Sequence, residues 1–245
     1  MVGAADHHSH ILPGVDDGVE TMDEAVRILA TYEELGIKEL WLTPHIMEDI
    51  PNTPEKLKTR FTQLQAAYKG NITLHLAAEY MIDNHLRKLL QETPPHFRGE
   101  VVEDRRGEKS PKECPNLLPI GNNGKHLLVE TSYYNAPIKF HETLKQIKAL
   151  GYYPLLAHPE RYMYMDEAEY RRLREEGVKF QLNLASLAGG YGKTVKKKAQ
   201  WLLENRFYSV AGSDLHCEDA IEYITNCKLS KQAIEQIERL LHNSI

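Results

Sequence analysis

The sequence has no long hydrophobic run and few cysteines. A membrane-spanning helix needs roughly 18 or more apolar residues in a row, and no hydrophobic stretch here approaches that length. Residues 1–5 have neither the basic start nor the apolar core of a signal peptide. The 3 cysteines are an odd number without a metal-binding spacing, which favours a reducing compartment over a disulfide framework. We therefore expect a cytoplasmic protein with no direct membrane insertion.

Positive charge is also scarce. The chain carries 30 Lys and Arg against 35 Asp and Glu, a formal net charge of −5. It therefore lacks the basic face that a polyanion requires, and we expect no nucleic-acid partner. No cysteine is followed six positions later by an arginine, which excludes the short cysteine-phosphate loop of thiol-dependent phosphatases.

Seven short apolar runs alternate with amphipathic stretches along the chain. This order is typical of repeated strand–helix units and predicts an α/β fold, a single distorted (β/α)7 TIM-like barrel domain over residues 1–245. Residues 93–124 carry no periodic apolar pattern, so we expect a long exposed loop inserted between the third and fourth strands. The predicted strands cover residues 3–8, 39–43, 72–78, 126–130, 153–157, 178–184 and 207–211. The predicted helices cover residues 21–35, 54–68, 137–150, 166–176, 194–205 and 231–242.

Residues 6–18 gather three histidines and three carboxylates. Pro13 and two glycines prevent most of this stretch from forming a regular helix. His8 and His10 are two residues apart, so on an extended backbone they point to the same side and can bind one metal ion. Such a pair also occurs among ordinary surface and core residues, so the rest of the chain must decide between the two interpretations.

Metal-binding residue types follow six of the seven predicted strands. The carboxyl ends of the strands of a parallel barrel face one mouth, where the loops build the active site. Each residue alone is compatible with a structural role, but their recurrence predicts a shared metal site. Four carboxylates in one cleft imply more than one cation, and a mixed His/Asp/Glu shell suits zinc, manganese or iron. The candidate ligands are His8, His10, Asp17, His45, Glu79, Glu130, His158, Asp214 and His216.

The motifs that carry these residues resemble the polymerase-and-histidinol-phosphatase (PHP) superfamily. In order they are Asp6-x-His8-x-His10, Thr43-Pro44-His45, Glu79, His158-Pro159-Glu160-Arg161 and Ser213-Asp214-x-His216. Residues 10–18 and 156–162 look more specifically like the bacterial metal-dependent protein-tyrosine phosphatases of capsule and exopolysaccharide loci. This resemblance implies hydrolysis of phosphotyrosine on a protein, with a bacterial tyrosine kinase or polysaccharide co-polymerase as the substrate.

The resemblance also implies three divalent metal ions, with manganese first and iron or zinc as alternatives. The implied ligands are His8, His10, Glu79 and Asp214 for the first ion, Glu79, Glu130 and His158 for the second, and Asp17, His45 and His216 for the third. Arg161 matches the family's phosphate-binding arginine, and Arg161, Asp17 and Glu130 are the candidate catalytic residues. The family often has a further arginine after the last motif, whereas the next arginine here is Arg239.

Two other functions stay open at this point. A small-molecule phosphatase such as histidinol phosphatase would use the same metal site, and a non-catalytic protein would use it structurally. A metal-dependent nuclease fits less well, because the acidic chain lacks a basic groove. Asp6 is expected to orient a ligand residue rather than to bind metal. Further candidates, each also compatible with a structural role, are His7, Asp16 and Asn183 for proton transfer or substrate orientation, and Tyr133, Tyr134, Tyr162 and Tyr164 for contact with an aromatic leaving group.

Overall fold

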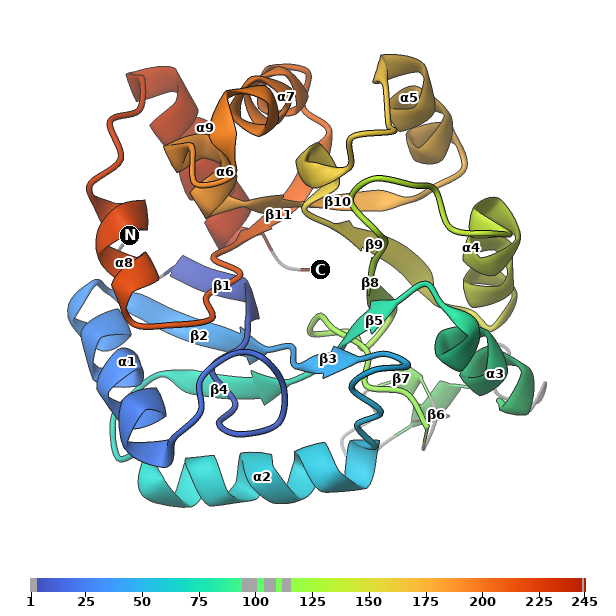
Figure 1. Ribbon diagram of the computed structural model, residues 1–245. Helices are drawn as coiled ribbons and strands as arrows, with labels where there is room; N and C mark the ends of the chain where they lie inside the picture. Colours follow the sequence, from blue (N-terminus) through green and yellow to red (C-terminus); the bar gives the residue numbers. More distant parts are fainter. Residues whose placement is uncertain (1–3, 94–100, 104–108, 112–115, 244) are drawn as a thin grey trace.

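Parallel strands form a ring with helices around its outside (Figure 1). The computed structural model describes residues 4–93, 101–103, 109–111, 116–243 and 245. The predicted α/β, barrel-like fold is confirmed. Among these residues, no helix is both long enough and apolar enough to cross a membrane.

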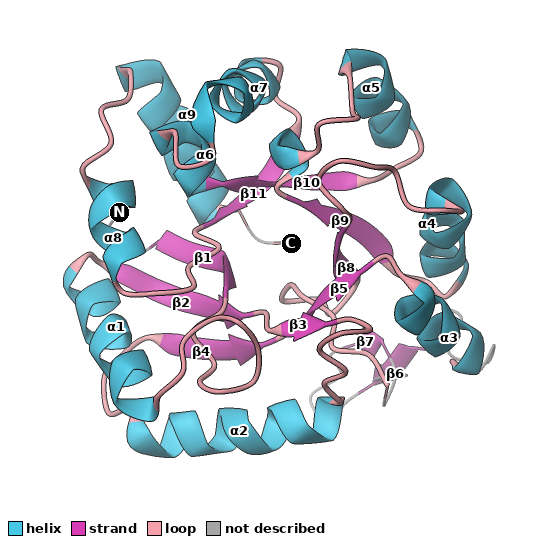
Figure 2. Ribbon diagram, in the orientation of Figure 1, coloured by secondary structure: helices cyan, strands magenta, loops and turns pink. Residues whose placement is uncertain are grey.

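The ring is built from two parallel sheets (Figure 2). The first contains, in spatial order, β1 (Ala4–Ser9), β2 (Ile37–Leu42) and β4 (Thr73–Leu76). The second contains β11 (Tyr208–Gly212), β10 (Lys179–Asn183), β9 (Tyr153–Ala157), β8 (His126–Glu130), β5 (Glu79–Met81) and β3 (His45–Ile46).

Two predicted strands, over residues 39–43 and 72–78, correspond to β2 and β4, and each is followed by a short strand that was not predicted. The chain leaves the first sheet at the end of β2 and joins the second sheet at β3, and β4 and β5 are related in the same way. Pro44 lies between β2 and β3, where its missing N–H cannot serve a strand ladder. His45 and Glu79 follow β2 and β4 as predicted, and each is also the first residue of a short second strand.

The two sheets also meet where β1 lies beside β11. The backbone N–H of Asp214 donates to the carbonyl of His8 at 2.8 Å, and the N–H of His10 donates to the carbonyl of Leu215 at 2.9 Å. These bonds bring the first and last predicted ligand segments together, although more than 200 residues separate them in the chain.

Several helices begin at conventional capping residues, whereas α4, α7 and α8 have no side-chain cap. The side chain of Thr21 accepts the N–H of Glu24, and Asp166 accepts the N–H of Glu169 in the same way. Three short helices, α3, α6 and α8, were not predicted. The helices are α1 (Met22–Glu34), α2 (Pro54–Ala67), α3 (Asn84–Glu92), α4 (Phe140–Ala149), α5 (Glu167–Glu175), α6 (Leu184–Ala188), α7 (Gly192–Glu204), α8 (Asp219–Thr225) and α9 (Lys231–His242), with a short 3₁₀ helix at Pro159–Arg161.

The buried apolar residues form two separate clusters. The larger one joins the helices to the strands and includes, for example, Ile28 of α1 and Leu144 of α4. The smaller one, which we call the interior cluster, includes Trp41 of β2, Leu128 of β8 and Val210 of β11, strands on different sides of the ring, and therefore fills the inside. The interior cluster consists of Trp41, Ala77, Ile120, Leu128, Leu155, Ala157, Val210 and Ile245.

The prediction of an exposed loop over residues 93–124 is wrong for two parts of that segment. β6 (Val101–Glu103) and β7 (Lys109–Pro111) pair as an antiparallel ladder. Leu117, Leu118 and Ile120 are buried, because they pack beneath the ring, where the carbonyl of Leu118 accepts the N–H of Ala78 at 3.2 Å. These apolar residues are too few to produce a periodic pattern. Residues 94–100, 104–108 and 112–115 of the predicted loop lie outside the described residues.

Candidate metal centre and active site

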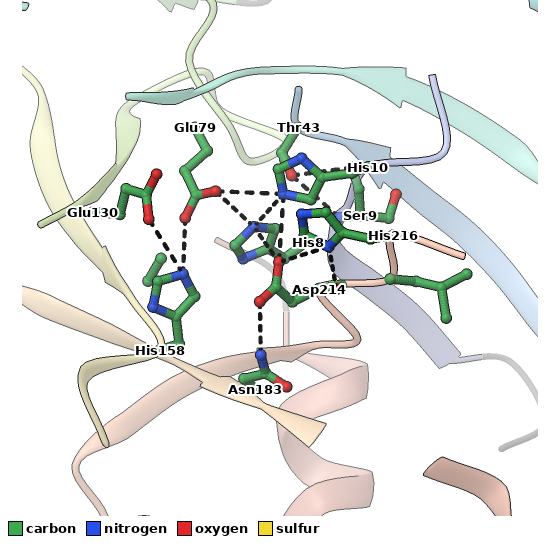
Figure 3. A network of polar contacts seen from close by, with 12 residues as sticks. His8, Ser9, His10, Thr43, Glu79, Glu130, His158, Asn183, Asp214 and His216 are labelled. Atoms are coloured by element: carbon green, nitrogen blue, oxygen red, sulfur yellow. Dashed lines mark hydrogen bonds and ion pairs between the residues drawn. The ribbon is translucent and has the colours of Figure 1, made fainter. Parts of the chain in front are cut away.

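The nine candidate ligands lie together at the mouth of the ring. Figure 3 shows all of them except Asp17 and His45 as labelled side chains. Eight of them form three overlapping groups, and the donor atoms within each group lie within 4.8 Å of one another. The groups are His8, His10, Glu79 and Asp214; His10, Asp17, His45 and His216; and His45, Glu79 and Glu130. His158, the ninth, places its Nε2 3.1 Å from Oε1 of Glu79 and 3.8 Å from Oε2 of Glu130.

The first group matches the first ligand set implied by the resemblance. Nε2 of His8 lies 3.1 Å from Oε2 of Glu79, and Nε2 of His10 lies 3.4 Å from the same oxygen. Both ring nitrogens also lie 3.4 Å from Oδ1 of Asp214, and they are 3.1 Å from each other. Two imidazole nitrogens this close cannot both direct a proton at the other, so at least one lone pair faces the centre of the group.

Two side chains hold these imidazoles from behind. Nδ1 of His10 lies 2.9 Å from Oδ2 of Asp16, an oxygen that also accepts the N–H of His45 at 3.0 Å. Nδ1 of His8 lies 3.1 Å from Oε1 of Gln181. Each contact uses the outer nitrogen of its ring and leaves Nε2 facing the cluster, as is usual for metal-binding histidines. Asp16 was a candidate from the sequence, but Gln181, one polar residue inside a strand, gave no recognisable signal.

The third implied set, Asp17, His45 and His216, lies at the solvent side of the cluster. Oδ1 of Asp17 is 3.5 Å from Nε2 of His45 and 3.6 Å from Nε2 of His216. The side chain of Asp17 is 66% exposed, whereas that of His45 is 9% exposed. In the structure His10 belongs to this group as well, so its imidazole stands between the inner and outer groups.

Two buried polar atoms in the cluster test whether it fits a metal ion. Oε2 of Glu79 and Nδ1 of His45 lie 3.3 Å apart, and neither has a hydrogen-bond partner among the described residues. Such an atom is costly to bury unless it has a partner. A divalent cation would satisfy both, and the nitrogen and oxygen donors around them are the ligands that zinc, manganese and iron accept. The residues present therefore fit a metal centre.

The electrostatics of the cluster also favour added positive charge. Burial by itself lowers the pKa of His8, but the carboxylates of Glu79 and Asp214 outweigh it and raise the pKa to about 9. Burial likewise opposes charge on His10, yet the hydrogen bond with Asp16 and the nearby carboxylates of Asp214 and Glu79 hold its pKa well above the usual value. Burial raises the pKa of Asp214, but the facing imidazoles of His8 and His10 bring it well below the usual value. The buried carboxylates thus draw cationic charge into the site.

Two of the four non-glycine residues with a positive φ among the described residues are ligands of the cluster. His158 has a φ of 32° and Asp214 a φ of 55°, in the left-handed region that residues other than glycine rarely adopt. Gly212 leaves room for this arrangement, because a Cβ there would lie 2.5 Å from Cβ of His8. Strain of this kind costs about 1–3 kcal/mol per residue and is typical of functional sites.

Arg161 lies beside the first group. Its Nη1 donates to Oδ2 of Asp214 at 3.0 Å, and the same oxygen accepts Nδ2 of Asn183 at 2.7 Å. The Arg161 guanidinium also lies over two aromatic rings, 4.2 Å from the ring centre of Tyr133 and 4.0 Å from that of Tyr191. The aromatic contacts and the carboxylate leave the arginine 16% exposed and well ordered for binding an anion.

Arg161 and Asp214, together with several of the other ligands, line a groove of about 590 Å³. Tyr133 and Tyr134, both predicted at the mouth, border it, and so does Tyr191, which the sequence analysis missed. The signal for Tyr191 was weak: a tyrosine within the glycine-rich run 189–192. Its pKa is raised, chiefly by burial, so its hydroxyl keeps its proton at neutral pH.

Some other candidates lie outside the groove. Nδ1 of His7 lies 3.3 Å from the carbonyl of Ala211, away from the cluster. Tyr162 is fully buried and donates to the carbonyl of Ala157, and Tyr164 is bonded to Thr131.

Asp6 behaves as expected of a residue that orients a ligand segment. Its Oδ1 accepts the backbone N–H groups of His8 at 3.1 Å and of Ser213 at 2.9 Å. It therefore acts on the backbone of the two ligand segments rather than on a ligand side chain.

Comparison with known proteins places this site in a family. Tyrosine-protein phosphatase CpsB of Streptococcus pneumoniae is 30% identical over 227 residues, which cover 88% of this chain and 84% of the relative. Tyrosine-protein phosphatase YwqE of Bacillus subtilis is 27% identical over 215 residues, which cover 86% of this chain and 76% of the relative. The chain is thus matched over nearly its whole length by proteins of similar size.

Solved structures show the same fold. YwqE from Bacillus subtilis and CpsB from Streptococcus pneumoniae have been described as unique metal-dependent tyrosine phosphatases; a chain from that work superposes with a TM-score of 0.72 at 22% identity, covering 98% of this chain and 95% of that chain. An amidohydrolase from Mycoplasma synoviae superposes with a TM-score of 0.54 at 12% identity, covering 99% of this chain and 86% of that chain. The family described as capsular polysaccharide synthesis, CpsB/CapC, matches residues 4–96 and 116–239. Because this match extends over most of the sequence, the chain belongs to the CpsB/CapC family.

Proposed function

We propose that this protein is a metal-dependent phosphatase that hydrolyses phosphotyrosine on protein substrates. The observation that carries the proposal is the buried cluster of histidines and carboxylates that opens, beside Arg161, into a groove bordered by tyrosines. The named activity of the relatives, tyrosine-protein phosphatase, supports the same chemistry.

The cluster has donors for three divalent ions, and we propose manganese as the metal, with iron or zinc as alternatives. The first ion would be held by His8, His10, Glu79 and Asp214, the second by Glu79, Glu130 and His158, and the third by Asp17, His45 and His216. Glu79 supports this assignment, because its two oxygens face different neighbours: Oε1 faces His158 and Oε2 faces His8. Bound divalent ions would supply hydroxide at neutral pH and offset the negative charge of the phosphate.

The side chains of the chain itself then bind and orient the ester. Arg161 can donate a forked pair of hydrogen bonds to phosphate oxygens, which fixes the phosphorus opposite the attacking oxygen. The exposed Asp17 carboxylate can accept a proton from the attacking water at the solvent side of the cluster. Glu130 lies at the inner side, where it would help to bind the second ion. The oxygen of this water molecule forms a bond to phosphorus while the bond to the phenolic oxygen breaks, and the proton that the water gives up passes to the phenolate.

The rim of the groove favours an aromatic ester. Tyr134 is 75% exposed and Tyr133 stands beside Arg161, so the leaving phenol would meet aromatic surfaces. We propose that the substrate is the tyrosine kinase or co-polymerase that controls capsular or exopolysaccharide synthesis, in keeping with the family of the chain. A cytoplasmic location, predicted from the cysteine count, would give access to such a kinase.

Metal removal tests this function directly. We expect a chelator to abolish hydrolysis of a phosphotyrosyl peptide and added manganese to restore it, with elemental analysis recording the metal content. Arg161→Lys keeps the charge but loses the fork, so we expect kcat/KM to fall about 10- to 100-fold. Full turnover in chelator together with inactivation by thiol alkylation would contradict the proposal. Faster hydrolysis of histidinol phosphate than of the peptide would instead favour a small-molecule phosphatase.

A further inference from the structure

A tyrosine on a glycine-rich turn reaches back into the groove. Residues 189–192 follow α6, and Gly189 has a φ of 98°, which turns the chain sharply after that helix. Tyr191, the next residue but one, is at the start of α7, where its side chain makes no capping hydrogen bond. Its ring instead lies over Arg161, 4.0 Å from the guanidinium carbon.

The hydrogen bonds around the Tyr191 hydroxyl leave its proton available. Nδ2 of Asn183 donates to this hydroxyl at 3.3 Å and to Oδ2 of Asp214 at 2.7 Å. The two amide protons are therefore used, and the Tyr191 oxygen acts as an acceptor. A hydroxyl that accepts in this way still has its own proton to donate, and no described residue receives it.

Cationic donors for a phosphate are scarce in the groove, which is also lined by hydroxyl groups such as those of Ser132 and Tyr133. Arg161 is the one lysine or arginine among the described residues that line it, and Arg161 already donates to Asp214. A phosphate monoester presents three non-bridging oxygens, more than one guanidinium fork can satisfy. The Tyr191 hydroxyl borders the same groove and is joined through Asn183 to the Asp214 carboxylate, so it stands next to the arginine that would bind the anion.

We propose that the Tyr191 hydroxyl donates a hydrogen bond to a non-bridging phosphate oxygen of the substrate. Together with Arg161 it forms a two-residue phosphate subsite, in which the Tyr191 ring holds the guanidinium and the hydroxyl supplies a further donor. This inference rests on the proposed phosphatase function. It assigns substrate binding to a residue outside the metal cluster and outside the motifs of the sequence.

Tyr191→Phe distinguishes the contribution of the Tyr191 hydroxyl from that of its ring. The variant keeps the aromatic contact with Arg161 and loses only the donor, so we expect the metal-loaded protein to bind inorganic phosphate about tenfold more weakly by calorimetry. We expect KM for a phosphotyrosyl peptide to rise by a similar factor, with unchanged metal content and thermal stability. Tyr191→Ala also removes the ring and should weaken phosphate binding further. Tyr153→Phe is the matched control, because Tyr153 begins β9, at the end of that strand away from the ligand His158. This variant should bind phosphate as the wild type does.

The possible outcomes distinguish this inference from the proposed function. If the wild type hydrolyses the peptide and Tyr191→Phe binds phosphate normally while Tyr191→Ala does not, the ring matters and the hydroxyl proposal is wrong. If both variants bind phosphate as the wild type does, Tyr191 has no place in the subsite. If the metal-loaded wild type does not hydrolyse the peptide, the proposed function itself fails.

Discussion

The inside of the ring has two layers of opposite character. The interior cluster is entirely apolar, whereas the mouth next to it holds buried histidines and carboxylates. β8 contains both layers on one face, since Leu128 belongs to the interior cluster and Glu130, two residues later, belongs to the ligands. The same change occurs between Ala77 and Glu79.

We expect the apolar layer to contribute mainly to the stability of the fold and the polar layer mainly to metal binding and catalysis. Apolar side chains in the interior cluster gain free energy by leaving water, about 25 cal/mol per Å² buried. Buried carboxylates and imidazoles lose their hydration free energy. Interactions with one another or with bound cations offset that loss. We therefore expect the apolar layer to set the baseline stability and the polar layer to make that stability depend on metal.

Glu130→Gln breaks the polar layer on β8. Substitution of residues behind a metal ligand typically costs about 10- to 100-fold in metal affinity or activity, and loss of the ligand itself should exceed 100-fold in kcat/KM. Manganese should also raise the melting temperature of the metal-free variant by less than it raises that of the wild type, because a bound ligand stabilises the folded protein less when its affinity is lower. Calorimetric melting with and without manganese measures this, and an undiminished shift would remove Glu130 from the ligand set.

Leu128→Ala breaks the apolar layer on the same strand. The cavity should lower the free energy of unfolding by about 3 kcal/mol, within the range of roughly 2–5 for buried Leu to Ala changes. Denaturant unfolding of the metal-free protein measures this loss. The manganese-induced rise in melting temperature should remain, as should most of the hydrolysis. If Leu128→Ala lost metal binding as Glu130→Gln does, the two layers would not be separable.

His126 sharpens the comparison from the end of β8 opposite the ligands. It is 4% exposed, and neither ring nitrogen has a hydrogen-bond partner among the described residues. Burial first, and Lys179 second, lower its pKa from 6.5 to about 4. The unfolded chain therefore binds the proton more tightly, and stability present above pH 6.5 is lost as the pH falls toward 4.

His126→Leu removes this titration. Between pH 6.5 and 4.5 the metal-free wild type should lose stability more steeply than the variant, by at most about 1.4 kcal/mol per pH unit. Urea unfolding at several pH values measures the difference between the two slopes. Equal slopes would show that His126 takes up its proton without cost in the folded protein.

The candidate site was largely predictable because its residues occupy recognisable positions along the chain. His158 and Asp214 each follow a predicted strand, and parallel strands bring their carboxyl ends to one mouth. The segment 93–124 was harder, because Leu117, Leu118 and Ile120 form a short apolar group without periodicity, and its burial depends on contact with the ring. The short strands β3 and β5 were not predicted, because two or three residues are too few to show an alternating hydrophobic pattern.

The sequence by itself determined the strand–helix order and the set of side chains that meet at the mouth. The spacing of residues along the chain and their placement at strand ends are local properties, so they can be predicted from the sequence without knowledge of the fold. Only the tertiary structure decided that Gln181 holds His8 and that Tyr191 covers Arg161. Those contacts join residues 30 or more positions apart, and their geometry depends on the register of neighbouring strands and on one sharp turn.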